Sequence, residues 1–335
     1  DEDWTQDKWN AEYRFNREDV VDSGTSPCKT NCPAHIGIQG YVKLASQGKY
    51  REALELIKLE NPLPAVCGRI CNRRCEQACM RGEIDSPIAI DEIKKFIAAQ
   101  ELTASGRFVP KKHHDYSNIK VAVVGSGPAG LSCAYYLALD GYSVTVFEKE
   151  QQLGGMLTLG VPAFRLEKDV IDAEIAIIRE LGVEFKTGVE VGKDVSLDAL
   201  RKQGYAAFYV AIGAQGGRAL GVEGEDAKGV VSGIEFLRRV NAGENAKLSG
   251  KTVVIGGGNV AVDVARTAVR SGASEVTMVC LESRKEMPAS EEEIAEAEEE
   301  QISIDNGWGP RRILSETGKV TGVEFKRCTT VFNAE

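Results

Sequence analysis

One local pattern occurs twice in this chain and constrains its fold more than any other feature: a buried strand, a glycine-rich turn and a helix with one apolar face. The first copy is IKVAVVGSGPAGLSCAYYLALDGYSVTVFEKE from Ile119, and the second is GKTVVIGGGNVAVDVARTAVRSGASEVTMVCLESR from Gly250. Each copy continues into a second strand, which is typical of a parallel α/β unit that binds a dinucleotide. The repeat therefore predicts an α/β protein with two Rossmann-like dinucleotide-binding domains.

The first turn, GSGPAG, has glycine wherever dinucleotide binding needs it. Gly125 permits the tight turn, Gly127 lets the backbone approach a pyrophosphate, and Gly130 lets the helix pack against the strand. The helix N-terminus then offers unpaired N–H groups to the phosphates. Glu148 ends the second strand, where a carboxylate can accept both hydroxyls of an adenosine ribose. The alternative is a glycine turn kept only for packing.

The second turn, GGGNVA, has the related form with alanine in the last position. It begins at Gly256 and Gly258, and the strand predicted over 276–281 leads into Glu282. This unit is interpreted as a nicotinamide dinucleotide site, and the alternative is a degenerate unit without a ligand.

Two further segments favour close approach of backbone to a ligand. The stretch LGGMLTLGVPAFRLEKDVI at 153–171 has a glycine pair and a Pro-x-x-Arg motif, which would let backbone approach a flat ring. Residues 205–212 predict a buried strand that ends at Gly213.

Six of the nine cysteines lie between Cys28 and Cys79, as C-x3-C-P and then C-x3-C-x3-C-x3-C. The chain has no C-x-x-C, which argues against a zinc knuckle and against the active-site disulfide of a thioredoxin-reductase-like enzyme. Cubane iron–sulfur clusters take four thiolates. The pattern favours an iron–sulfur site beside two dinucleotide sites, with zinc and simple buried thiols as alternatives.

Composition excludes several other classes. The 335 residues exceed one ordinary domain, and 43% hydrophobic with 27% charged residues is normal for a globular protein. No apolar run is long enough for a membrane span, and the acidic start does not resemble a signal peptide. The net charge of −9 argues against nucleic acid as a partner. We expect a cytoplasmic protein.

The chain divides into three predicted parts: a mainly helical module over 1–115, a first dinucleotide domain over 116–247 and a second over 248–335. In the helical module, 40–60 predicts two helices broken at Gly48, and 88–97 predicts another. Residues 103–118 are interpreted as a linker. The acidic run at 291–300 is interpreted as a solvated helix face, with a partner-binding role as the alternative.

Seven ordered motifs resemble the family of the glutamate synthase small (β) subunit. It includes the amino-terminal half of dihydropyrimidine dehydrogenase and the large subunit of NADH-dependent ferredoxin–NADP oxidoreductase. The motifs are CKTNCPAHIGIQGYVKLASQGKYREAL, NPLPAVCGRICNRRCEQAC, PIAIDEIKKFI, VVGSGPAGLSCAYYLA, LGGMLTLGVPAFRL, GGGNVAVDVART and ESRKEMPA. The resemblance implies FAD at the first turn, NAD(P)H at the second and a [4Fe–4S] cluster in the helical module.

The resemblance also assigns site residues by position. Those implied to contact FAD are Gly125, Gly127, Ala129, Gly130, Glu148, Lys149, Gly155, Met156, Arg165, Val191 and Gly213. Those implied to contact the nicotinamide dinucleotide are Gly256, Gly258, Asn259, Val260, Glu282 and Arg284. The implied cluster ligands are Cys32, Cys71, Cys75 and Cys79.

The chain departs from the family pattern in two places. Members with two clusters have an extra C-x2-C before the position of Cys28, and dihydropyrimidine dehydrogenase has a glutamine where this chain has Lys94. Cys28 and Cys67 are thus unassigned; they could ligate a cluster together with a partner chain or be buried thiols. The family's returning FAD segment would follow the second domain, so we expect a fragment or a chain completed by another polypeptide.

The predicted function is that of an NAD(P)H-dependent flavoprotein oxidoreductase. Hydride would pass from NAD(P)H to FAD, and electrons would leave singly through the cluster to a larger catalytic or electron-accepting subunit. We expect no catalytic acid, base or nucleophile. Glu282 favours NADH over NADPH, although Arg284 could reach a 2′-phosphate. The alternatives are a non-enzymatic cluster-bearing docking module and a stand-alone flavin or disulfide reductase.

Overall fold

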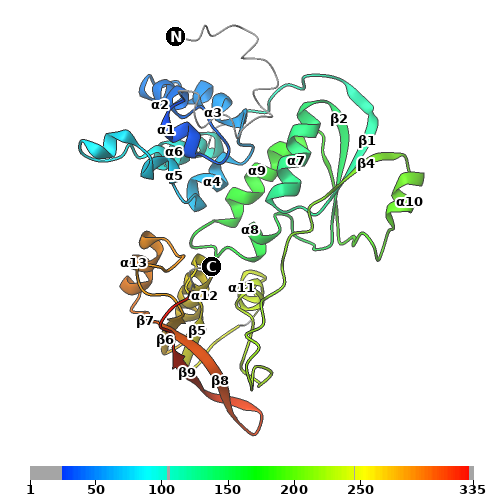
Figure 1. The fold of residues 1–335 in the computed structure, drawn as a ribbon. Helices are drawn as coiled ribbons and strands as arrows, with labels where there is room; N and C mark the ends of the chain where they lie inside the picture. The colour runs from blue at the N-terminus through cyan, green and yellow to red at the C-terminus, as the bar shows by residue number, and fades with distance from the viewer. Residues whose placement is uncertain (1–24, 104–105, 245, 332–335) are drawn as a thin grey trace.

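The computed structural model describes residues 25–103, 106–244 and 246–331, and it contains three bodies (Figure 1). A group of short helices comes first, a four-stranded α/β unit follows, and a three-stranded α/β unit with a β-hairpin comes last. Within this part of the chain, none of the helices is long and apolar enough to cross a membrane.

The helical module is built from short amphipathic segments around a small core that contains Tyr41, Ile57 and Ile97. The predicted break at Gly48 is confirmed, because its positive φ of 72° ends one helix and allows the next to begin. The predicted helix over 88–97 is also present and extends further. The helices are α1 (Pro27–Asn31), α2 (Ile38–Ser46), α3 (Tyr50–Lys58), α4 (Pro64–Ile70), α5 (Arg74–Gln77), the 3₁₀ helix η4 (Met80–Glu83) and α6 (Ile90–Thr103).

The first α/β unit is a parallel sheet in the order β3-β2-β1-β4. Val121–Val124 is buried because β1 lies between β2 and β4 and is covered by helices. The unit contains β1 (Tyr116–Val124), α7 (Pro128–Leu139), β2 (Tyr142–Glu148), α8 (Met156–Leu159), α9 (Lys168–Glu180), β3 (Glu184–Thr187), α10 (Leu197–Lys202) and β4 (Tyr205–Val210). The interpretation of 103–118 as a linker was therefore too long at its end, since β1 begins at Tyr116.

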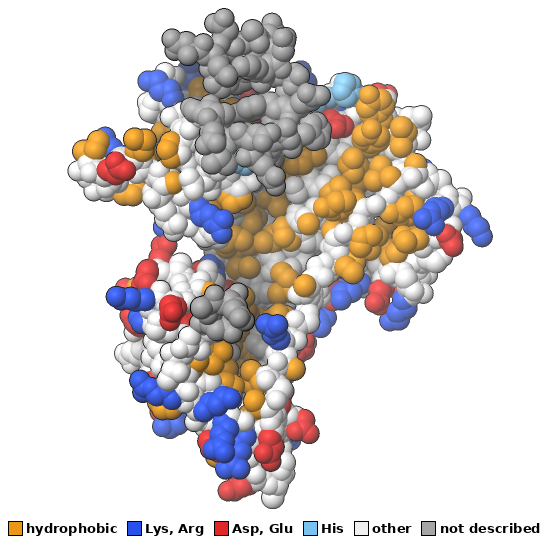
Figure 2. All heavy atoms as spheres, viewed as in Figure 1, with side chains coloured by type: hydrophobic (Ala, Val, Ile, Leu, Met, Phe, Trp, Pro, Cys, Tyr) orange, Lys and Arg blue, Asp and Glu red, His pale blue; other side chains and the backbone are white. Residues whose placement is uncertain are grey.

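The prediction of a buried strand over 205–212 was wrong about burial. β4 pairs with β1 along one edge, and no strand described in this structure pairs with its other edge. Val210 is 61% exposed and Ile212 is 64% exposed. Figure 2 shows apolar side chains gathered over the part of the molecule where this sheet lies. The apolar sequence thus reflects an uncovered sheet edge and not a filled core.

The second α/β unit repeats the plan on a smaller scale. Its three parallel strands run in the order β5-β6-β7, and an antiparallel hairpin of β8 and β9 follows. The core contains Val262, Met278 and Ile294. The elements are α11 (Gly233–Asn241), β5 (Lys251–Ile255), α12 (Asn259–Arg270), β6 (Glu275–Cys280), α13 (Glu291–Glu299), β7 (Ser303–Asn306), β8 (Trp308–Glu316) and β9 (Lys319–Arg327).

Part of the helical module packs into the apolar core of the first α/β unit, while the core around Tyr41, Ile57 and Ile97 forms a separate cluster. Leu63, Ala65 and Val66 of the helical module pack in the same buried cluster as Leu131 of α7 and Ile171 of α9. The buried core of the second α/β unit is separate from this cluster. Burial of shared apolar surface holds neighbouring bodies in a fixed arrangement, so the cysteine-bearing module and the first unit form one rigid block.

A buried charge network lies within this block. Lys58 Nζ is 3.0 Å from Glu101 Oε2, and both side chains are almost fully buried. Glu174 of α9 accepts a hydrogen bond of 2.6 Å from the backbone N–H of Ala65. Burial raises the pKa of Glu174 to about 7, and the Lys58 ammonium opposes that shift. Lys58 is therefore the cation on which two buried carboxyl groups depend.

We predict that Lys58→Met destabilises the protein by about 3–5 kcal/mol, because it leaves the Glu101 carboxylate buried without its cation. The matched control is Lys251→Met, which breaks the exposed pair with Glu275 and should change stability by less than about 1 kcal/mol. Denaturant unfolding followed by circular dichroism measures both. Equal effects from the two variants would show that the Lys58 pair does not support the shared core.

Candidate cofactor sites

The first glycine turn has the geometry that close backbone packing requires. Gly125 has a φ of 102°, a conformation that side-chain-bearing residues rarely adopt. A Cβ on Gly130 would lie 1.9 Å from the carbonyl oxygen of Gly125, so this position has no room for a side chain. A Cβ on Gly127 would meet nothing within 4 Å. Gly125 and Gly130 thus serve packing, while Gly127 leaves open space at the start of α7.

Glu148 fixes the shape of this turn. Its side chain is buried, and Oε2 accepts hydrogen bonds from the backbone N–H and the hydroxyl of Ser126, at 2.8 Å and 2.6 Å. Oε1 accepts another from the backbone N–H of Glu150 at 2.9 Å. The sequence argument assigned Glu148 to a ribose and missed its bonds to Ser126, although a hydroxyl inside a glycine turn was the available signal. The contact of Glu148 with a ribose stays a prediction.

The other residues predicted to contact FAD lie in different surroundings. Gly155 packs on the first turn, because its Cβ would lie 2.8 Å from the Cα of Gly127. Met156 lines a pocket of about 180 Å³ between α8 and α11, with Ser232 and Arg238 on the other wall. Ala129 and Lys149 are exposed, Val191 is half-buried in a bridge to Val195, and Gly213 has open space around it with a φ of 69°. These contacts stay predictions.

The second glycine turn is covered by the segment that follows β6. The N–H of Ala289 donates to the carbonyl of Gly257 at 3.1 Å, and the N–H of Ser290 donates to Asn259 Oδ1 at 2.9 Å. Asn259, predicted to contact a dinucleotide, therefore holds the covering segment in place. Gly256 has a φ of 144°, and a Cβ on Gly258 would meet only Pro288, at 3.9 Å.

Two charged residues predicted to select the dinucleotide lie at the end of β6. Glu282 lies beside the turn, since a Cβ on Gly257 would be 3.0 Å from its Oε2. Arg284 turns toward α13, where it pairs with Glu291 at 3.1 Å and lies 3.7 Å from Glu298. Val260 is 56% exposed at the first turn of α12. The carboxylate thus lies at the glycine turn, while the guanidinium is engaged by acidic side chains.

Three of the four predicted cluster ligands lie close together. Cys75 of α5 is buried in the core of the helical module, and Cys32 packs against that core. Burial and the neighbouring Cys71 and Cys32 together raise the pKa of the Cys75 thiol to about 11. The backbone N–H of Arg73 donates to Cys71 Sγ at 3.5 Å. Such short backbone loops around sulfur suit iron–sulfur ligation.

The described cysteines are not arranged around a preformed metal position. All nine cysteines are free thiols, and none of the described groups of three or more His, Cys, Asp or Glu side chains is already arranged around a metal position. Cys79 lies beyond α5, where η4 begins. The thiols are available for a cluster, but ligation by Cys32, Cys71, Cys75 and Cys79 stays a prediction.

Lys94 occupies a buried position beside the cysteines. Its side chain is 7% exposed, and Nζ lies 2.6 Å from Asp91 Oδ1. Burial raises the pKa of the Cys67 thiol, and the positive charge of Lys94 opposes that rise. An ammonium group has no lone pair for iron, so Cys67 faces a cation where a second cluster would need a ligand.

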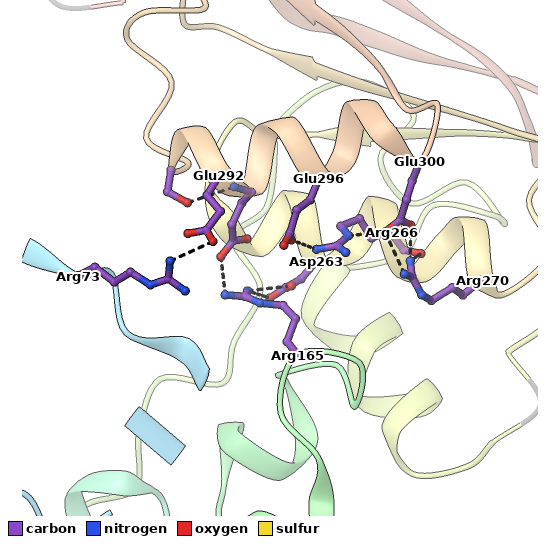
Figure 3. A network of polar contacts seen from close by, with 10 residues as sticks. Arg73, Arg165, Asp263, Arg266, Arg270, Glu292, Glu296 and Glu300 are labelled. Carbon is purple, nitrogen blue, oxygen red and sulfur yellow. Dashed lines mark hydrogen bonds and ion pairs between the residues drawn. The ribbon is translucent and has the colours of Figure 1, made fainter. Parts of the chain in front are cut away.

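The acidic run at 291–300 is solvated on one face, as the sequence suggested, but its other carboxylates are paired with arginines. Glu293 is buried and pairs with Arg165 of the first α/β unit, and Glu292 lies 3.1 Å from Arg73 of the helical module. Figure 3 shows how the carboxylates of α13 meet arginines from all three bodies. Arg266 and Arg270 of α12 pair with Glu300, and Arg266 also pairs with Glu296. The sequence did not reveal these pairs because the arginines lie far from the run in the chain.

Two family models match the chain. The model described as dihydropyrimidine dehydrogenase domain II, 4Fe-4S cluster, matches residues 18–105. The model described as pyridine nucleotide-disulphide oxidoreductase matches residues 119–326. The matches place a 4Fe–4S domain on the cysteine-bearing module and one oxidoreductase domain across both glycine turns.

Named relatives agree with these matches. The β subunit of the NADPH-Fe(3+) oxidoreductase of Geobacter sulfurreducens is 41% identical over 92% of this chain and 46% of the relative. The small chain of glutamate synthase [NADPH] of Escherichia coli is 36% identical over 91% of this chain and 67% of the relative. This chain thus spans about half the length of the first of these relatives. The structure of Mycobacterium tuberculosis FprA with NADPH shares the fold, with a TM-score of 0.54, 19% identity and coverage of 63% of this chain and 67% of FprA.

The two glycines of the first turn should respond differently to the same substitution. Gly130→Ala should destabilise the protein by about 1–3 kcal/mol, because the new methyl group meets the Gly125 carbonyl. Gly127→Ala should leave thermal stability of the ligand-free protein nearly unchanged, but weaken FAD binding about tenfold or more, because the methyl group fills the open space at the helix N-terminus. Thermal unfolding and FAD titration measure the two effects. Unchanged FAD affinity in Gly127→Ala would place the pyrophosphate elsewhere.

Proposed function

We propose that this chain, which belongs to the pyridine nucleotide-disulphide oxidoreductase family, moves electrons from NAD(P)H through FAD to an iron–sulfur cluster. A 4Fe–4S domain precedes the oxidoreductase domain in the sequence. The observation that carries this proposal is the shared core of the cysteine-bearing module and the first α/β unit. A cluster held on the same rigid block as a flavin can exchange electrons with it without a domain movement.

The residues of the first unit fit a bound FAD. The open space at Gly127 and the N-terminus of α7 would receive the pyrophosphate, and Gly130 would keep that helix close to β1. Glu148 and Ser126 would hold the turn in shape, so the phosphate-binding N–H groups are oriented before the cofactor arrives. When bound, the flavin supplies the chemistry of accepting a hydride and releasing electrons one at a time.

The protein's own contribution is positioning. Transfer of a hydride between two rings depends on their distance and orientation, so the second unit must hold its dinucleotide against the first. The backbone N–H groups of Ala289 and Ser290 form hydrogen bonds to the second glycine turn and hold the covering segment in place. Val260, in the first turn of α12, remains exposed. No general acid or base is assigned to this step.

We further propose that the electrons leave to a larger partner subunit. The relatives in Geobacter sulfurreducens and Escherichia coli are named as a β subunit and a small chain, which supports a multi-subunit assembly. The exposed edge and apolar end of β4 offer surface for a further polypeptide. The net charge of −9 supports a partner other than nucleic acid.

The proposed cluster predicts a metal content. Anaerobically prepared protein should contain about four irons per chain, as one cubane held by four thiolates requires. Cys75→Ser should lose the iron and its visible absorption, because Cys75 is the buried thiol among the proposed ligands and has Cys32 and Cys71 as neighbours. Cys133→Ser and Cys280→Ser are the controls and should keep the iron. About eight irons per chain would contradict the single-cluster proposal, and tightly bound zinc without sulfide would contradict any iron–sulfur cluster.

The second site also predicts a choice of dinucleotide. Glu282 lies at the glycine turn while Arg284 is paired with Glu291, an arrangement that favours the free 2′-hydroxyl of NADH over the 2′-phosphate of NADPH. The names of the relatives specify NADPH and support the opposite choice. Steady-state kcat/KM with an artificial acceptor decides between them. NADH should give the higher value, and Glu282→Arg should shift preference toward NADPH; equal or higher kcat/KM with NADPH would overturn the assignment.

A further inference from the structure

A loop of the first α/β unit makes one contact with the second unit, beside the packing of α8 against α11, where Asn241 Nδ2 donates to the carbonyl oxygens of Leu159 and Val161. Residues 161–167 lie between α8 and α9, and Arg165 of this loop reaches α12 and α13 (Figure 3). The Phe164 ring lies 4.0 Å from the guanidinium carbon of Arg270 and 4.9 Å from that of Arg266. The loop therefore inserts an aromatic ring and a cation into the surface of the second unit.

Arg165 is shared by two carboxyl groups of the second unit. Its Nη1 donates to both oxygens of Asp263, at 2.9 Å and 2.8 Å, and its Nη2 pairs with Glu293 Oε1. All three side chains are less than one-fifth exposed. The second oxygen of Glu293 is buried and has no hydrogen-bond partner among the described residues. An unpartnered buried carboxyl oxygen is a position where a proton is easily held.

The balance of charges around this contact also favours a proton on Glu293. Three guanidinium groups face four carboxyl groups, so the cluster carries one excess negative charge when every acid is ionised. The members are Arg165, Arg266, Arg270, Asp263, Glu293, Glu296 and Glu300. Burial, opposed by Arg165 and Arg266 and assisted by the Asp263 and Glu296 carboxylates, raises the pKa of Glu293 to about 7.

We propose that Arg165, Asp263 and Glu293 form an interdomain joint that sets the position of the second α/β unit over the flavin site, with Glu293 as a positioning residue for hydride transfer. The part that concerns hydride transfer rests on the proposed function; the joint itself does not. The buried cores of the two units are separate, so this polar contact orients one unit on the other together with the packing of α8 against α11. The neighbouring pair of Arg73 and Glu292 is more exposed and contributes little.

The contact between the two α/β units is linked to the protonation of Glu293. Where the units are in contact the pKa of Glu293 is raised, and where they separate it returns toward its ordinary value. Contact therefore takes up a proton on Glu293. The stabilisation that this proton gives is fully present below the ordinary glutamate pKa and is lost as the pH rises toward about 7.

Small-angle X-ray scattering of the ligand-free full chain tests the joint without any cofactor chemistry. For the wild type we expect the radius of gyration to increase as the pH rises from 5 through about 7. Glu293→Gln should remain compact across this range, because the amide keeps the size of the side chain and removes the titration. Glu299→Gln, an exposed acid on the same helix, should behave like the wild type. A wild-type radius that does not change with pH, or the same pH-dependent increase in Glu293→Gln, would overturn the joint.

A pair of charge reversals tests the positioning role. Glu293→Lys places a cation beside Arg165 and should enlarge the radius of gyration at every pH, while slowing reduction of the bound flavin by NAD(P)H about 10- to 100-fold. Glu299→Lys makes the same change of charge on the exposed side and should alter neither quantity. If Glu293→Lys stays compact and reduces its flavin at the wild-type rate, Glu293 is not a positioning residue. A wild type whose flavin NAD(P)H does not reduce would defeat the proposed function, while the scattering result would still decide the joint.

Discussion

The arrangement of this protein depends on a contrast between two interdomain contacts. Helix α4 of the cysteine-bearing module and the first α/β unit bury apolar side chains in one common core, in which Ala65 and Val66 pack with Leu131 and Ile171. The second α/β unit has its own core and meets the first unit through paired charges, the Phe164 ring and hydrogen bonds from Asn241 of α11. Apolar packing is dense and tolerates little displacement, whereas charged contacts respond to pH, salt and ligands. The apolar contact therefore suits two cofactors held at a fixed distance. The polar contact suits a second α/β unit whose position changes with conditions.

This contrast matches the order of the proposed electron path. Transfer between flavin and cluster needs a constant distance, and the shared core supplies it. Hydride transfer needs a dinucleotide that arrives, reacts and leaves, and a unit held by the loop of Phe164 and Arg165 can accommodate that cycle. Glu167, at the end of the same loop, also pairs with Arg69 of the helical module at 2.5 Å. A single loop thus contacts both neighbours of the flavin site.

The sequence predicted local geometry well and interdomain contacts poorly. Gly125 and Gly130 were assigned correctly to the turn and to helix packing, because a glycine turn after a buried strand has one steric solution. The ion pairs of the acidic run of α13 were missed because the arginines that form them come from segments distant in the chain. The burial of β4 was misjudged for a similar reason, since an apolar strand carries no information on whether a neighbour covers it. For Glu148, the sequence predicted the position at the end of the second strand but not the hydrogen bond from the Ser126 hydroxyl.

The most direct test of the account is rapid mixing of anaerobic, fully loaded protein with the preferred dinucleotide, followed by both flavin absorption and the electron paramagnetic resonance of the cluster. The account predicts that the flavin band bleaches first and that the signal of a reduced [4Fe–4S] cluster then appears within the same chain. The Cys75→Ser variant should bleach its flavin without developing that signal. A cluster signal that appears while the flavin stays oxidised, or a bleached flavin beside an oxidised cluster in the wild type, would contradict an electron path from dinucleotide through flavin to cluster.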